Sequence, residues 1–138
     1  MPLEFEHRDQ DGVEILALKG RLVFGEEDLA LRNEIGKAVR AGIIRIVLDL
    51  GELTDIDTTG LGTLLFTLAK LRKAGGGLAL AKLHPSHMHL LVIAKMETVL
   101  KVFDHEQDAI NSLFPDRQVP RFDILEFLET LRNKSARA

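Results

Sequence analysis

The segment Leu53-Thr54-Asp55-Ile56-Asp57-Thr58-Thr59-Gly60-Leu61-Gly62 connects a continuous apolar run to an amphipathic one. Upstream of it, residues 43–50 read Ile-Ile-Arg-Ile-Val-Leu-Asp-Leu, which has the length and character of a buried strand. Downstream, leucines at positions 61, 64, 65, 68 and 71 recur on one side of a predicted helix. The hydroxyls of Thr58 and Thr59 are therefore expected in a strand-to-helix turn. The helix N-terminus there offers free N–H groups and a partial positive charge, which suit a phosphate.

The chain before this segment is predicted to form a β-hairpin and a helix. Alternation over residues 3–7 indicates a half-buried strand, 9–12 a turn, and 13–19 the returning strand. Residues 20–25 interrupt the alternation and are expected to form a loop. Three consecutive acids then begin a helix at residue 26, and Gly42 ends it.

The chain after this segment alternates helices and strands. A helix over 59–74 stops at a triple glycine and a strand over 78–83 follows. A second helix begins at His84-Pro85-Ser86, an edge strand is expected over 99–103, and a helix from residue 104 ends near Phe114. This order predicts an α/β fold. Its mixed β-sheet, an N-terminal hairpin followed by parallel strands, is flanked by helices.

An additional C-terminal element is expected. Two prolines mark residues 115–121 as a linker that follows a domain of residues 1–114. Apolar residues at 124, 127, 128 and 131 predict an extra amphipathic helix over 122–134. Its apolar face can pack on the domain, which is the simpler interpretation, or dock on a partner or a second protomer. Both a monomer and a homodimer are therefore compatible with the sequence.

Composition excludes several classes of function. The 138 residues carry a net charge of −3 with scattered Lys and Arg, so direct nucleic-acid binding is not expected. Cysteine is absent, which excludes disulfides and thiol chemistry. The N-terminus does not resemble a signal peptide, and no apolar run approaches the roughly 20 residues that cross a membrane. We expect a cytoplasmic protein without membrane insertion.

The two adjacent threonines have a simple structural interpretation as a helix cap, since a Ser, Thr or Asp oxygen can satisfy a free N–H group. A functional interpretation is favoured by the second hydroxyl, by the neighbouring Asp55 and Asp57, and by Gly60 and Gly62. Glycine costs about 1 kcal/mol relative to alanine inside a helix. Bare backbone at these positions leaves room for another protein or a nucleotide to approach.

Other candidate chemistry is weaker. His84, His87 and His89 lie close in sequence, but helical spacing turns the last two apart, so capping or solvated histidines are favoured over a metal site. Thr58 as a nucleophile has no identifiable base, and we expect no enzymatic activity. Residues 75–77 follow a helix instead of preceding one, so they do not form a phosphate loop. No motif indicates a cofactor.

The stretch Asp57-Thr58-Thr59-Gly60-Leu61-Gly62 resembles the signature of STAS domains, in particular the bacterial anti-sigma factor antagonists, or anti-anti-sigma factors. Their usual form is Asp-Ser-Ser/Thr-Gly-Leu-Gly after a buried strand. The resemblance spans about residues 3–114 and includes the N-terminal hairpin, Gly20 at a strand end, and the glycine stop before 78–83. It implies a domain that binds an anti-sigma factor, commonly an ATP-dependent Ser/Thr kinase, and thereby regulates sigma-factor-dependent transcription.

The resemblance also implies a phosphorylation switch. The kinase modifies the hydroxyl after the motif aspartate, which is Thr58 here with Thr59 as the alternative, and a phosphatase restores the active form. The implied docking surface contains Asp55, Asp57, Thr58, Thr59, Gly60, Leu61, Gly62, Arg21 and Val23.

Two departures from the family pattern concern the partner. The acceptor is Thr where Ser is commoner, and Arg21 and Val23 lie where the loop after Gly20 often carries an acid. The partner surface that faces this loop is therefore expected to differ. STAS domains also serve as regulatory subunits of membrane transport systems and as sensors or scaffolds, and an unmodified Thr58 would favour that alternative.

Overall fold

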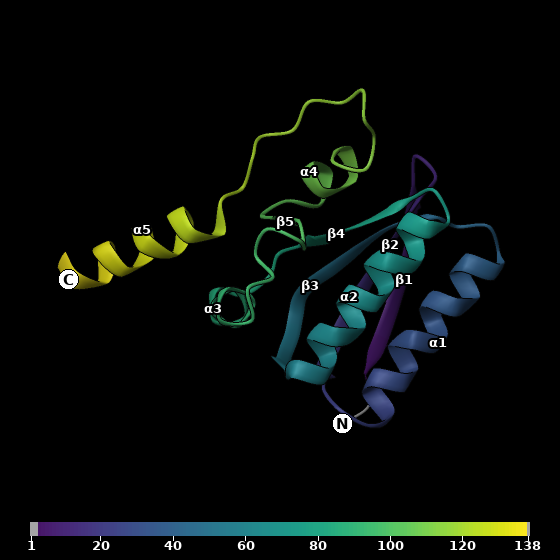
Figure 1. Cartoon of the computed structure of the whole chain (residues 1–138), viewed down its shortest axis with the longest axis horizontal. Helices are drawn as coiled ribbons and strands as arrows, with labels where there is room; N and C mark the ends of the chain where they lie inside the picture. Colours follow the sequence, from purple (N-terminus) through teal and green to yellow (C-terminus); the bar gives the residue numbers. More distant parts are fainter. Residues whose placement is uncertain (1–2, 138) are drawn as a thin grey trace.

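The computed structural model describes residues 3–137. A five-stranded sheet with the order β1-β2-β3-β4-β5 forms its centre (Figure 1). The first two strands are antiparallel and the others run parallel to the second, so the predicted mixed sheet is confirmed. The strands are β1 (Glu4–Gln10), β2 (Val13–Leu22), β3 (Arg45–Ile56), β4 (Gly77–Ala81) and β5 (Val102–Phe103).

Helices cover both faces of the sheet. In Figure 1 α1 and α2 lie side by side in front of the strands, and α5 extends away from the sheet at the opposite side of the molecule from α1. Alternation along β3 explains the two layers: Ile46, Leu48 and Leu50 belong to the main core with α1 and α2, whereas Val47 belongs to a second core with α4. The helices are α1 (Glu26–Arg40), α2 (Thr58–Lys73), α3 (Pro85–Ile93), α4 (Glu106–Asn111) and α5 (Ile124–Arg137).

Strands β2 and β3 are longer than the sequence predicted. Residues 20–22 were expected in a loop, but they belong to β2, and β3 continues past residue 50. The two ends pair with each other, with Leu22 opposite Ile56 after register shifts near Ala17 and Gly20. A local pattern cannot reveal this pairing because the partner strand is distant in sequence. The extension carries Arg21 and Asp55 to one edge of the sheet.

The C-terminal elements also differ in extent. Strand β5 covers only two of the predicted residues 99–103, and α4 ends at Asn111 before Phe114. Helix α5 begins at Ile124 and packs on α3, with Ile124 and Leu128 buried. The simpler interpretation of its apolar face is confirmed, whereas the division into residues 1–114 and a linker stays a prediction. Among residues 3–137, no helix is long and apolar enough to cross a membrane.

Candidate functional site

Thr58 is the first residue of α2 and lies just past the carboxyl end of β3. Its side chain is exposed, whereas Thr59 is half-buried. The backbone N–H of Asp57 donates to the carbonyl of Leu22 over 3.3 Å, which fixes the turn against the end of β2. A surface hydroxyl therefore lies at the carboxyl edge of parallel strands, where α/β folds commonly bind ligands.

Asp57 caps α2. Its Oδ1 accepts a hydrogen bond from the N–H of Gly60 over 2.8 Å, and its Oδ2 accepts one from the N–H of Phe24 over 2.9 Å. The expectation that a threonine caps this helix is wrong, because the preceding aspartate already satisfies the free N–H group. Within residues 3–137 the hydroxyl of Thr58 makes no hydrogen bond, so it is available for other chemistry.

The carboxyl group of Asp57 is held in its ionised form. Burial alone would raise its pKa, but hydrogen bonds from the backbone N–H groups of Phe24, Gly60 and Thr59 outweigh burial and lower the pKa. A negative charge is therefore fixed one residue before the Thr58 hydroxyl. That charge suits the helix dipole, and it opposes a second anion on Thr58.

Gly60 is required by the fold. A Cβ there would overlap the carbonyl oxygen of Leu22 and lie 2.9 Å from Cγ1 of Ile56. The expectation that Gly60 leaves room for a partner is wrong, because this chain fills the space, and the side chain of Leu61 is buried in the core. A Cβ on Gly62 would meet nothing within 4 Å. Of these three motif residues, only Gly62 offers bare backbone to a partner.

Arg21 and Asp55 form an ion pair beside the threonines. The two residues pair across β2 and β3, and Arg21 Nε lies 3.6 Å from Asp55 Oδ2. Both side chains are at least half exposed, so this pair contributes little to stability. Val23 follows at the end of β2 and is half-buried. Arg21 therefore offsets one of the two acidic charges that flank Thr58.

Sequence reasoning missed three exposed apolar side chains: one in the loop before α1, one on α1 and one on α2. Phe24, Leu29 and Phe66 are 79%, 59% and 44% exposed. The guanidinium of Arg32 lies 4.7 Å from the ring centre of Phe66, and Lys70 Nζ lies 5.8 Å from it. The sequence held one indication that Phe24 is exposed, because it is an aromatic residue in a predicted loop where it has no role in a turn. Leu29 and Phe66 had none, because helical periodicity does not tell which apolar residue stays uncovered.

The helices α1 and α2 are joined by a buried polar contact. The hydroxyl of Thr63 donates to Oδ1 of Asp28, and Arg32 Nε lies 3.4 Å from Oδ2 of the same carboxylate. Asp28 was assigned only to the first helical turn, where it complements the dipole. Its bond to Thr63 also fixes α1, which carries Leu29, beside α2, which carries Phe66.

The three histidines do not gather into a metal centre. The Nδ1 of His84 accepts a hydrogen bond from the N–H of Ser86 over 3.1 Å, so the capping interpretation of His84 is confirmed. His87 Nδ1 is buried without a hydrogen-bond partner. Burial, and then the charge of His84, lower the pKa of His87 despite the nearby Asp55. Residues 3–137 contain no group of three or more His, Asp or Glu side chains able to bind a metal ion.

Comparison with known proteins identifies the family. Residues 4–109 match the STAS domain family. The chain belongs to this family. A relative from Paenibacillus polymyxa, "Anti-sigma F factor antagonist", is 29% identical over 82% of this chain and 97% of its own. The "Putative anti-sigma factor antagonist BtrV" of Bordetella bronchiseptica is 33% identical over 67% of this chain and 77% of its own.

A solved structure shows the same fold. The crystal structure of a putative anti-sigma factor antagonist from Thermotoga maritima superimposes with a TM-score of 0.73. The two chains are 22% identical, and the similarity covers 79% of this chain and 93% of the other. The STAS match ends at residue 109, so the segment that leads to α5, and α5 itself, lie outside it.

Proposed function

We propose that this STAS domain is a cytoplasmic anti-sigma factor antagonist whose binding is switched off by phosphorylation of Thr58. Its partners are an anti-sigma factor with Ser/Thr kinase activity and a phosphatase that restores the unmodified form. The observation that carries the proposal is the exposed Thr58 hydroxyl at the start of α2, next to the Asp57 cap. The names of the two relatives support the same role.

Thr58 is the better candidate than Thr59 for the hydroxyl that receives the phosphate. Its side chain is exposed and makes no hydrogen bond within residues 3–137. Thr59 is half-buried, and its carbonyl accepts a hydrogen bond from the hydroxyl of Thr63 over 3.3 Å. A kinase must surround the acceptor hydroxyl, so the more exposed residue is favoured.

Phosphorylation is expected to change binding more than folding. A phosphate adds roughly −1.5 to −2 charge at pH 7, which the N-terminus of α2 tolerates. Asp55 and Asp57 oppose this charge, while Arg21 lies 3.6 Å from Asp55 and offsets part of the opposition. These effects partly cancel within the domain. A partner docked over the modified hydroxyl would instead have to bury an uncompensated dianion.

The proposed docking surface extends from Thr58 along α1 and α2. It includes Gly62 and the exposed side chains of Phe24, Leu29 and Phe66, with Asp55, Arg21, Val23 and Thr59 at its edge. Asp57, Gly60 and Leu61 contribute by positioning the turn. In this proposal the three exposed apolar side chains become buried against the partner.

The experiment is intact-mass analysis and site mapping of the protein purified from its native cells, followed by binding to the kinase recovered with it. One phosphate on Thr58, and tight binding only of the unmodified form, are expected. Thr58→Ala should bind without being switched off. Thr130→Ala removes another exposed threonine on α5 and should behave as the wild type. An unmodified Thr58 in a protein recovered with an integral membrane partner would instead indicate the transport-subunit or scaffold role.

A further inference from the structure

The segment outside the STAS match lines one side of an open cavity that the proposed switch does not use. The cavity has a volume of about 540 Å³ and lies between β5 and the chain that leads into α5. Residues 112–125 form one of its walls, whereas the STAS match ends at residue 109. Small-molecule sites span roughly 300–1,000 Å³, so this volume suits a small ligand. The cavity therefore depends on the segment outside the STAS match.

Most of the lining side chains are apolar. Strand β5 contributes Val102 and Phe103, which are buried, and the extension contributes Phe114, Val119 and Phe122, which are half-buried. Phe103 belongs to the same core as these three residues of the extension, whereas the buried Val102 belongs to the main core. The apolar side chains offer a surface to the apolar part of a ligand, and the polar lining offers one to its polar part.

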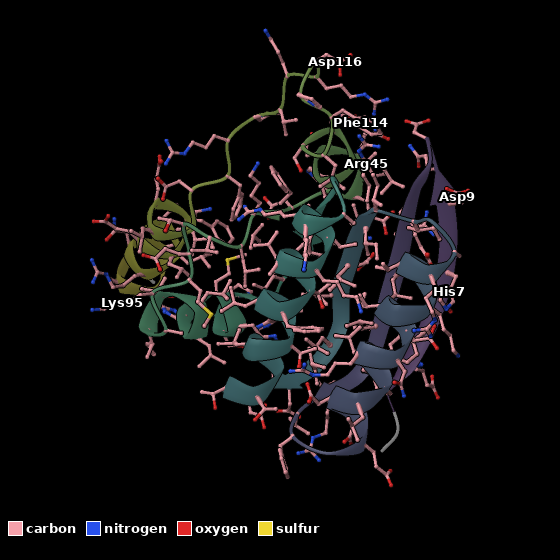
Figure 2. The ribbon with its side chains drawn as sticks, turned by 45° about the vertical axis from the view of Figure 1, so that its right-hand side comes forward. His7, Asp9, Arg45, Lys95, Phe114 and Asp116 are labelled. Carbon is pink, nitrogen blue, oxygen red and sulfur yellow. The ribbon has the colours of Figure 1, made fainter. Side chains whose placement is uncertain are left out.

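Aromatic contacts hold the wall of the extension in place. Two guanidinium groups contact Phe114, with Arg45 at 5.0 Å and Arg117 at 4.0 Å from its ring centre. Figure 2 shows Arg45 and Phe114 adjacent at one end of the molecule. The ring of Phe122 lies 5.2 Å from that of Phe127 on α5. The cavity is thus largely formed before a ligand arrives, which reduces the cost of binding.

Two cationic side chains at the cavity have no ion-pair partner within residues 3–137. Lys101 and Arg121 line it, are exposed, and form no ion pair with any other residue of the range 3–137. Arg117 is already committed, because its Nη1 bonds Asn111 over 3.0 Å and lies 3.3 Å from Asp11.

Two acids also line the cavity. The carboxylate of Asp123 accepts a hydrogen bond from the N–H of Glu126 at the start of α5. Glu97 has one buried carboxylate oxygen without a partner, so it is the group that would instead favour a cationic ligand.

We propose that this cavity binds an amphipathic anion, with an apolar body against Val102, Phe114 and Phe122 and a carboxylate head bound by Lys101 and Arg121. Charge-assisted hydrogen bonds to the head would supply the selectivity. The ligand would contact both β5 and the segment before α5, so binding should favour the packing of α5 on α3. This inference does not depend on phosphorylation of Thr58.

The test uses the full chain and three probes with the same tail: octanoate, octanol and octylammonium, titrated by calorimetry at low salt. Octanoate should bind saturably. Octanol and octylammonium should bind at least about tenfold more weakly than octanoate. The double variant Lys101→Gln, Arg121→Gln should weaken octanoate about tenfold and leave octanol unchanged. The matched control Lys95→Gln, Arg132→Gln removes two exposed cations that do not line the cavity and should have no effect.

A second variant tests the location of the site. Val119→Trp places a large ring in the cavity and should abolish octanoate binding while urea unfolding shows a folded domain. Equal binding of octanoate and octanol would overturn the proposed anion selectivity. Tighter binding of octylammonium would assign the site to Glu97 and a cationic ligand, which also contradicts the proposal. Absence of saturable binding to all three probes would overturn it entirely.

Discussion

The carboxylate of Asp57 accepts a hydrogen bond of 2.9 Å from the backbone N–H of Phe24, thirty-three positions earlier in the chain. The same carboxylate caps α2 through Gly60. One side chain therefore joins the end of β2 to the turn that presents Thr58. The geometry of the proposed phosphorylation site depends on this connection as well as on the local motif.

Replacement of Asp57 should destabilise the domain. Asp57→Ala removes a helix cap and leaves the N–H groups of Phe24 and Gly60 without their charged acceptor. We expect the free energy of unfolding to fall by about 2–4 kcal/mol, measured by urea denaturation. Asp123→Ala is the matched control, because it removes one exposed cap contact from α5 and should cost about 1 kcal/mol or less. Equal losses in the two variants would contradict the connecting role of Asp57.

Alanine substitution of the two motif glycines should change the stability of the domain in opposite directions. Gly60→Ala forces a Cβ against the carbonyl of Leu22 and should destabilise the domain by about 3 kcal/mol or more. Gly62→Ala meets nothing within 4 Å in a helix interior and should stabilise the domain by up to about 1 kcal/mol. Thermal unfolding of both variants measures the difference. If Gly62 belongs to the docking surface, the stabilised Gly62→Ala protein should nevertheless bind the kinase more weakly.

A charge at position 58 should spare the fold. Thr58→Glu places a carboxylate on an exposed first-turn position, where the helix dipole favours it and Asp57 opposes it. We expect the free energy of unfolding to change by less than about 0.5 kcal/mol. Binding to the kinase should be lost. Circular dichroism and a binding titration on the same sample separate the two effects. A variant that unfolds would show that Thr58 is structural, against the proposed switch.

His87 should make stability depend on pH below neutrality. Its pKa is lowered in the folded state from the ordinary 6.5, chiefly by burial, so the unfolded chain binds a proton more readily. The stability that neutral His87 contributes is fully present above pH 6.5, and it is lost as the pH falls from there through the lower pKa of the folded state. Urea unfolding at pH 7 and pH 5 should show a smaller difference for His87→Gln than for the wild type. His89→Gln removes an exposed histidine of the same helix and should keep the wild-type difference.

The Asp28–Thr63 contact should carry a measurable coupling between α1 and α2. Thr63→Val leaves the buried carboxylate of Asp28 without one of its donors and should cost about 1–3 kcal/mol. Asp28→Ala combined with Thr63→Val should cost less than the sum of the single changes, because each single change removes the same bond. Denaturation of the four proteins of this double-mutant cycle gives the coupling energy. Simple additivity would show that the contact does not join the helices.

Local patterns were sufficient for the elements and for the general place of the site. Apolar periodicity predicted β3, α2 and the amphipathic α5, and the Asp-Thr-Thr-Gly stretch placed Thr58 at a helix start, because these features depend on neighbours within a few positions. Periodicity failed at the end of β2, where residues 20–22 belong to the strand. Their pairing with residues 53–56 of β3 is decided by a segment more than thirty positions away.

The sequence by itself determined the family motif, the order of strands and helices, and the position of the two threonines, since each is a property of contiguous residues. The tertiary structure alone decided the role of each motif residue. Leu22 fills the space beside Gly60, and Phe24 binds the second oxygen of Asp57. The exposed apolar residues of α1 and α2, and the cavity behind the C-terminal extension, likewise exist only once distant segments pack, because packing determines which apolar side chains remain uncovered.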